Sequence, residues 1–128
     1  MYTYPKTIAL AAFAFIWANS AFAAGNFTKT CSDIRIDNGV LMADCRAVNG
    51  EIAEVSYNLN SRVSNEDGTL RWEGGRFSET SQCKLDHYPD TTILQCDTRK
   101  RDGSWTSDYL NLDERIANIN GSLRYQTP

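Results

Sequence analysis

Apolar and polar residues alternate over short stretches of this chain. Residues 34–36 (IRI) and 40–42 (VLM) are separated by Asp37-Asn38-Gly39, where the glycine favours a tight turn between two strands. Residues 51–59 (EIAEVSYNL) alternate loosely, as a half-exposed strand does. No window has the 3.6-residue period of a long amphipathic helix. The pattern therefore predicts an all-β protein.

Two more hairpins are indicated by the pairs Asp67-Gly68 and Asn120-Gly121, which favour two-residue type I′ turns. Each pair lies between short β-prone runs. The segments 59–62 and 112–115 predict single helical turns, with Asn60 and Asp113 as their N-caps.

An internal repeat divides the chain at about 26–76 and 77–128. Residues 58–72 (NLNSRVSNEDGTLRW) and 111–125 (NLDERIANINGSLRY) share seven of fifteen positions at a constant offset of 53. Upstream, FTKTC aligns with FSETSQC if Ser81 and Gln82 are an insertion. One half of a domain this small buries little apolar surface by itself. We therefore expect the halves to pack intimately and to exchange their hairpins, which would permit a monomer or a domain-swapped dimer.

The first 23 residues have the features of an export signal. Lys6 precedes an apolar run over residues 8–17, and Ala21-Phe22-Ala23 supplies the small residues that a signal peptidase requires. The run ends at Asn19-Ser20, short of the roughly 18 apolar residues that a membrane span needs. We expect residues 24–128 to form one secreted domain.

Four cysteines, an even number in an exported chain, indicate disulfide bonds. Three pairings are open to them, and the repeat favours pairing within each copy, at separations of 14 and 13 residues. The expected disulfides are Cys31–Cys45 and Cys83–Cys96. Zinc binding is disfavoured because the chain has no C-x-x-C motif and a single histidine, His87.

The charge and the motifs exclude several classes of function. The net charge is −3, and the only basic run, residues 99–101, is flanked by Asp97 and Asp102. This argues against nucleic acid and anionic membranes as partners. No nucleophile elbow or phosphate-binding loop is present. Sixteen acidic residues leave a paired-carboxylate glycosidase open, although a fold of 105 residues offers little room for an enclosing cleft.

One ordered set of motifs covers residues 26–126. It reads F-x-x-T-C…C…N-L-N…N-x-D-G-x-L-x-W, then F-x-E-T…C…C-x-T-R…N-L-D-x-x-I-A-N-I-x-G-x-L-x-Y. This arrangement resembles the cyanovirin-N homology (CVNH) family. The resemblance implies an elongated two-domain β structure in which each domain mixes strands from both repeats. It also implies a lectin without catalysis, metal or cofactor, which binds high-mannose oligosaccharides or glycoproteins through terminal α1-2-linked mannose.

The resemblance also implies a shallow sugar site near each end of the molecule. The first site carries over to Asn65, Asp67, Gly75, Arg76, Glu79, Thr80, Asp97, Thr98, Arg99 and Arg101. The second carries over to Asn26, Lys29, Thr30, Arg46, Ala47, Val48, Asn49, Asn118 and Ile119. The carboxylates, amides, hydroxyls and guanidinium groups in these sets can pair with vicinal sugar hydroxyls. At the second site the family's glutamine, glutamate and threonine are replaced by Lys29, Arg46 and Val48.

These replacements keep an alternative open, a secreted interaction or effector protein on the same scaffold that has lost sugar binding. Trp72 shares its repeat position with Tyr125 and is expected to pack between the halves. The loop that begins at residue 100 is longer than in the family, and we place Trp105 in it. Trp105 has no counterpart in the other repeat and is therefore the aromatic residue expected to make an exposed contact. Asn26 and Asn120 each begin an N-x-S/T sequon.

Overall fold

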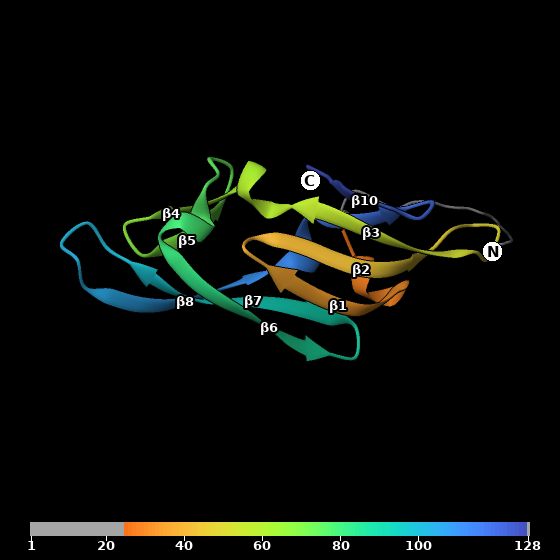
Figure 1. Cartoon of the computed structure of the whole chain (residues 1–128), viewed down its shortest axis with the longest axis horizontal. Helices are drawn as coiled ribbons and strands as arrows, with labels where there is room; N and C mark the ends of the chain where they lie inside the picture. Colours follow the sequence, from red (N-terminus) through yellow and green to blue (C-terminus); the bar gives the residue numbers. More distant parts are fainter. Residues whose placement is uncertain (1–24, 128) are drawn as a thin grey trace, which may run out of the picture.

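The computed structural model describes residues 25–127 and shows an elongated β protein (Figure 1). The predicted export signal, residues 1–23, lies outside the described residues. The strands are β1 (Cys31–Asp37), β2 (Val40–Arg46), β3 (Ile52–Asn58), β4 (Val63–Glu66), β5 (Thr69–Trp72), β6 (Ser81–Tyr88), β7 (Thr91–Arg99), β8 (Trp105–Asn111), β9 (Ile116–Ile119) and β10 (Ser122–Tyr125). Short 3-10 turns are η2 (Phe27–Lys29), η3 (Leu59–Ser61), η4 (Phe77–Glu79) and η5 (Leu112–Glu114).

The strands form two antiparallel three-stranded sheets, β1-β2-β3 and β6-β7-β8, and two hairpins, β4-β5 and β9-β10. Each hairpin packs on the sheet of the other repeat: β5 lies against β8, and β10 lies against β3. We call β1-β2-β3 with β9-β10 module 1, and β6-β7-β8 with β4-β5 module 2. The predicted exchange of hairpins is therefore confirmed, and the modules occupy opposite ends of the long axis (Figure 1).

The predicted turns are confirmed. Asp67 and Gly68 have φ of 51° and 95°, and Asn120 and Gly121 have 52° and 85°. Positive φ at both central residues is the signature of a type I′ turn, whose twist matches that of the flanking strands. The hairpins therefore end in rigid tips that can be held against another surface.

The predicted helical turns form, but their N-caps are Asn58 and Asn111 instead of Asn60 and Asp113. Each cap side chain accepts a hydrogen bond from the backbone N–H two residues later. The prediction was wrong because each turn begins directly after a strand, which places the asparagine at the strand end in the capping position.

Asn60 and Asp113 tie the two repeats together instead. The Asn60 Oδ1 accepts hydrogen bonds from the Ser78 N–H and Oγ at 3.0 and 2.9 Å. In the equivalent place, the Asp113 carboxylate accepts from the N–H and Oγ1 of Thr28 at 2.9 and 2.7 Å. Asp113 is buried, and its carboxylate also accepts from the Thr92 N–H at 2.8 Å. These contacts fix the junction between the repeats.

Both predicted disulfides, Cys31–Cys45 and Cys83–Cys96, are present. Phe27 and Phe77 are equivalent, and Cys31 and Ser81 each follow them by four residues. Ser81 is therefore the equivalent of Cys31, and it is a regular strand residue opposite Thr98. The interpretation of Ser81 and Gln82 as an insertion was therefore wrong. The second disulfide has moved two residues along the ladder, a step that keeps both cysteines on the same face of the sheet.

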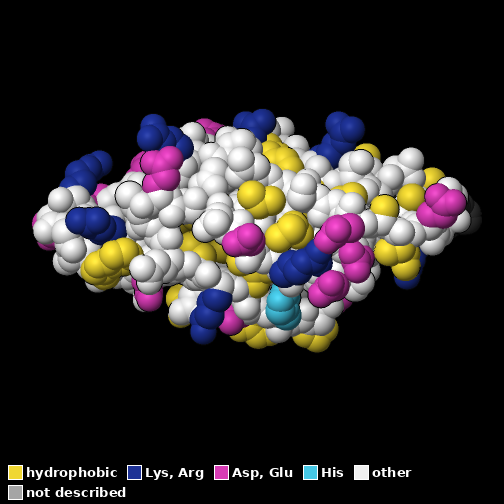
Figure 2. Space-filling view, viewed as in Figure 1, with side chains coloured by type: hydrophobic (Ala, Val, Ile, Leu, Met, Phe, Trp, Pro, Cys, Tyr) yellow, Lys and Arg dark blue, Asp and Glu magenta, His cyan; other side chains and the backbone are white. Residues whose placement is uncertain are grey.

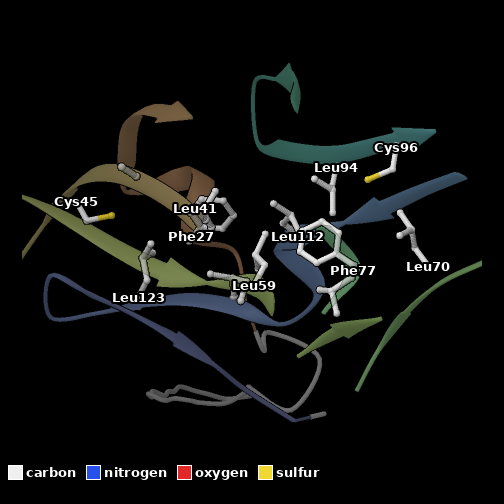
Figure 3. Close-up of a cluster of buried hydrophobic side chains, with 13 residues drawn as sticks. Phe27, Leu41, Cys45, Leu59, Leu70, Phe77, Leu94, Cys96, Leu112 and Leu123 are labelled. Carbon is white, nitrogen blue, oxygen red and sulfur yellow. The ribbon is translucent and has the colours of Figure 1, made fainter. Parts of the chain in front are cut away.

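The core is continuous across the junction. Figure 3 shows equivalent side chains from the two repeats in one buried cluster, among them Phe27 and Phe77 and also Leu59 and Leu112, all fully buried. The Trp72 and Tyr125 rings pack at 5.7 Å, as expected for residues between the halves. This shared core supports the outer ends of both modules.

Candidate binding sites

In module 2 the tip of the β4-β5 hairpin is held against the sheet by Asn65. Its Nδ2 donates to the Thr80 Oγ1 at 3.0 Å and to the Arg99 carbonyl at 2.9 Å. Its Oδ1 accepts from the Gly68 N–H at 2.7 Å. One side chain from the first repeat thus joins the hairpin to two residues of the second repeat.

A shallow pocket of about 380 Å³ lies where this tip meets the loop that follows β7. It is lined by Asn65, Glu66, Asp67, Thr80, Arg99, Lys100 and Arg101. The Asp67 carboxylate accepts from the Arg101 N–H at 2.9 Å and lies 3.9 Å from the Arg101 guanidinium. The structure therefore brings together carboxylates, a hydroxyl and cationic groups, the mixture that pairs with sugar hydroxyls.

Five residues of the predicted first site line this pocket, and two others were missed. Glu66 and Lys100 each neighbour a predicted residue in sequence, and the closure of the hairpin tip over the loop brings them into the pocket. Their side chains add one acidic and one basic group. The signal that could have found them is their place between predicted residues, at the turn and beside the basic run.

Glu79 and Arg76 form an exposed ion pair on η4, close in sequence to Thr80. The Arg76 Nε and Nη2 donate to the Glu79 carboxylate, each at 3.1 Å. This hydrogen bonding, and then the positive charge, lower the pKa of the Glu79 carboxyl below its ordinary value. Arg76 adopts the left-handed conformation, with φ of 66°, and Gly75 precedes it. Neither member of this pair, nor Gly75, lines the pocket, although Glu79 directly precedes the pocket residue Thr80.

The structure places Thr98 and Asp97 away from the pocket. Thr98 is fully buried, and its Oγ1 donates to the carbonyls of Gly68 and Thr106 at 2.8 and 3.0 Å. This hydroxyl binds the hairpin turn from the buried side of the sheet and does not face solvent. The expectation that Thr98 would contact sugar is therefore corrected. Asp97 lies on the outer face of the sheet, where its carboxylate accepts from the Ser107 Oγ at 2.9 Å.

Module 1 repeats the framework around Asn118. The Asn118 Nδ2 donates to the Thr30 Oγ1 at 2.8 Å and to the Arg46 carbonyl at 2.9 Å, and its Oδ1 accepts from the Gly121 N–H at 2.8 Å. The Asn120 Oδ1 accepts from the Val48 N–H at 3.0 Å, just as Asp67 accepts from Arg101. The backbone frame is therefore the same at both ends.

The second frame carries exposed apolar side chains beside exposed cationic ones. Val48, Ile52 and Ile119 are 90%, 60% and 43% exposed, although each is a large hydrophobic residue. Lys29 and Arg46 are also exposed. The remaining predicted residues of the second site lie around them: Asn26 at the start of η2, and Ala47 and Asn49 in the β2–β3 turn, where the Asn49 Oδ1 accepts from the Glu51 N–H. The two ends thus share a frame and differ in surface chemistry.

The prediction about Trp105 was partly wrong. Trp105 is the first residue of β8, directly opposite Arg99, and is 51% exposed. It has a structural counterpart, because Ile52 begins β3 opposite Arg46 in the same way. The exposed position agrees with the expectation, but a strand holds this side chain in place, not the loop.

Among residues 25–127, no three histidine, cysteine or acidic side chains gather as a metal site would need. No helix in this part of the chain is long and apolar enough to cross a membrane.

Comparison with known proteins identifies the family. The CVNH domain pattern matches residues 27–124, which is most of the chain. The chain belongs to the CVNH family. Members of this family are lectins, proteins that bind carbohydrate and typically do not transform it.

Several CVNH relatives are similar over nearly their whole length. A cyanovirin-N homolog of Neurospora crassa is 30% identical over 108 residues, 77% of this chain and 96% of the relative. The solved CVNH structure from Gibberella zeae has a TM-score of 0.72 at 29% identity and covers 80% of this chain and 99% of its own. A structure of microvirin in complex with mannobiose has a TM-score of 0.70 at 33% identity and covers 79% and 98%.

Proposed function

We propose that this protein is a secreted, non-catalytic lectin that binds terminal α1-2-linked mannose of high-mannose glycans through the module 2 pocket. The observation that carries the proposal is the pocket itself. A hairpin of one repeat and a loop of the other bring hydroxyl, carboxylate and guanidinium groups together over about 380 Å³. A shallow polar pocket of this kind suits a flexible ligand rich in hydroxyl groups.

A ligand of the mannose class is supported by similarity to microvirin, whose solved structure is a complex with mannobiose. The α1-2 linkage rests on the resemblance of the site residues to those of the family. Secretion rests on the N-terminal signal pattern and on two disulfides, which persist in oxidising compartments.

Module 1 is proposed as a second site of lower affinity for mannose. Its frame matches that of module 2, but its exposed Val48 and Ile119 offer few partners for hydroxyl groups. Two sites on one molecule would raise the avidity for a dense glycan array. The apolar end also keeps the alternative open, a secreted interaction or effector protein that uses this scaffold without binding sugar.

The test is a glycan-array screen of the unglycosylated chain without residues 1–23, followed by calorimetric titration with α1-2-mannobiose. We expect selective binding to glycans that end in this linkage. We expect Arg99→Ala to weaken the module 2 affinity by about tenfold, because it removes a charged donor from the pocket.

Arg46→Ala is the matched control, because Arg46 occupies the same ladder position in module 1. It should leave the module 2 affinity within about twofold. Absence of binding to mannose glycans at high protein concentration would overturn the proposal and favour the interaction protein.

A further inference from the structure

The outer face of the β6-β7-β8 sheet carries two aromatic side chains on β8 that are each about half exposed. Trp105 and Tyr109 are 51% and 58% exposed and lie on the same side of β8, because side chains alternate along a strand. They are four positions apart, about 13 Å along the strand. That spacing matches a short oligosaccharide better than a single sugar ring.

Polar groups fill the surface beside these rings. The strand register places Arg99 opposite Trp105, Asp97 opposite Ser107, and Gln95 opposite Tyr109. On β6, Gln82 and Lys84 lie opposite Asp97 and Gln95, and these residues line a small hollow of about 190 Å³. The face therefore offers amide, carboxylate and hydroxyl groups between two aromatic rings.

Module 1 lacks this arrangement at the equivalent positions. Ile52, Glu54 and Ser56 of β3 occupy the places of Trp105, Ser107 and Tyr109. Glu54 is paired with Arg35, which gives this face a charged character. The aromatic pair is therefore not a requirement of the fold, since the other module forms the same sheet without it.

The chemistry of the module 2 face fits a neutral glycan chain. Aromatic faces stack on the C–H faces of sugar rings, while amides and carboxylates pair with the hydroxyl groups at the ring edges. The face has two acidic side chains, Asp86 and Asp97, and two basic ones, Lys84 and Arg99, so it presents no block of one sign to attract a strongly charged partner. Figure 2 shows hydrophobic atoms at the surface beside Lys and Arg side chains at the end of the molecule where β8 lies.

Arg99 joins this face to the pocket. It lines the module 2 pocket and is also the residue directly opposite Trp105. We propose that the outer face of β6-β7-β8 is an extension subsite, which binds the stem of a neutral oligosaccharide whose terminal residue occupies the module 2 pocket. This inference rests on the proposed function, since the pocket must hold the terminal sugar.

The experiment compares a short ligand with a long one. α1-2-Mannobiose fills only the pocket, whereas a branched oligomannose glycan reaches the face as well. We expect the double variant Trp105→Ala/Tyr109→Ala to lower the affinity for oligomannose about tenfold and to leave the mannobiose affinity within about twofold in calorimetry. Tyr88→Ala is the control: Tyr88 is also 58% exposed, but it lies at the far end of this sheet, and the variant should bind both ligands normally.

A second readout separates the two proposals. The indole N–H resonance of Trp105, assigned by its loss in Trp105→Ala, should shift with oligomannose and not with mannobiose. Suppose that the wild-type protein binds mannobiose and that the double variant binds oligomannose as tightly as the wild type does. The extension subsite is then wrong, and the lectin proposal stands. If mannobiose does not bind but oligomannose shifts Trp105, the pocket assignment is wrong. If neither ligand binds or shifts Trp105, both proposals are wrong.

Discussion

Asn65 and Asn118 each join the two repeats with a single carboxamide. The amide nitrogen donates to a threonine hydroxyl and a backbone carbonyl of the other repeat, and the oxygen accepts from the glycine N–H in its own hairpin. Taken by itself, an asparagine two residues before Asp-Gly or Asn-Gly reads as part of a turn. Its second role depends on partners that lie 15 to 88 residues away in the chain.

Replacement of Asn65 by alanine should destabilise the protein by about 2 kcal/mol, because three hydrogen bonds of about 1 kcal/mol each are lost and partly replaced by water. Guanidinium unfolding measures the change. Asn118→Ala is the matched variant and should cost a similar amount. Only Asn65→Ala should also weaken mannobiose binding at the module 2 pocket, because Asn65 lines that pocket and Asn118 does not. Equal effects of both variants on the affinity of the module 2 pocket would contradict this assignment.

The Arg76–Glu79 pair predicts a local pH dependence on η4, next in sequence to the pocket residue Thr80. Since the Glu79 pKa is lowered in the folded protein, the pair contributes stability above the unfolded-state pKa and loses it as pH falls through the lower, folded value. Both side chains are exposed to solvent, so we expect the pair to change the ionisation of Glu79 and to contribute little to the stability of the fold. Arg76→Ala should raise the Glu79 midpoint in a carboxyl NMR titration. Arg71→Ala, which removes the partner of Glu66, should leave that midpoint unchanged.

At the scale of elements, the tip of each type I′ hairpin packs closely against the sheet of the other repeat. The β4-β5 tip approaches the sheet so closely that Gly68 has no room for a side chain: an added Cβ would lie 2.7 Å from the Thr106 methyl and 3.0 Å from the Lys100 Cγ. The hairpin therefore needs glycine at this position for two reasons, its positive φ and its close approach to the neighbouring strand and loop.

Gly68→Ala and Gly50→Ala separate these two reasons. Both glycines have positive φ, 95° and 89°, but Gly50 has no atom within 4 Å of an added Cβ. We expect Gly50→Ala to cost about 1 kcal/mol through backbone strain alone, and Gly68→Ala to cost at least about 2 kcal/mol because it also displaces the hairpin. Thermal unfolding measures both. Equal costs would mean that the hairpin tip does not pack as closely as described.

At the scale of the whole molecule, neither repeat is a structural unit. Each module takes its sheet from one repeat and its hairpin from the other, and the buried side chains of both meet in one core. The two modules occupy opposite ends of this interleaved body (Figure 1). A swapped dimer would form if the hairpins were exchanged between chains, through the linker that follows β5.

The interleaving predicts that half a chain does not fold. Residues 25–75 alone should lack cooperative unfolding in circular dichroism, because their sheet and hairpin are each left without the partner that buries them. Mixing with residues 76–127 should restore β structure in a concentration-dependent way. A cooperatively folded first half would show that each repeat folds on its own hairpin. The control is the full chain under the same conditions.

Local features were predictable from the sequence. The strands, the type I′ turns and the two disulfides all depend on period-two alternation, on residues that tolerate positive φ, and on the repeat. The helical turns were placed correctly too, but their caps were misplaced by two residues, because capping depends on where a preceding strand ends.

Which residues share a surface was decided by tertiary structure. Asp97 and Thr98 are adjacent in the predicted site, yet one faces outward and the other is buried, because successive residues of a strand point to opposite sides of the sheet. Glu66 and Lys100 meet at the pocket only because a hairpin of one repeat closes over a loop of the other. The sequence determined the elements and the exchange-prone repeat through local conformational preference. The sites depend on long-range packing, since their groups come from segments that only the shared core brings together.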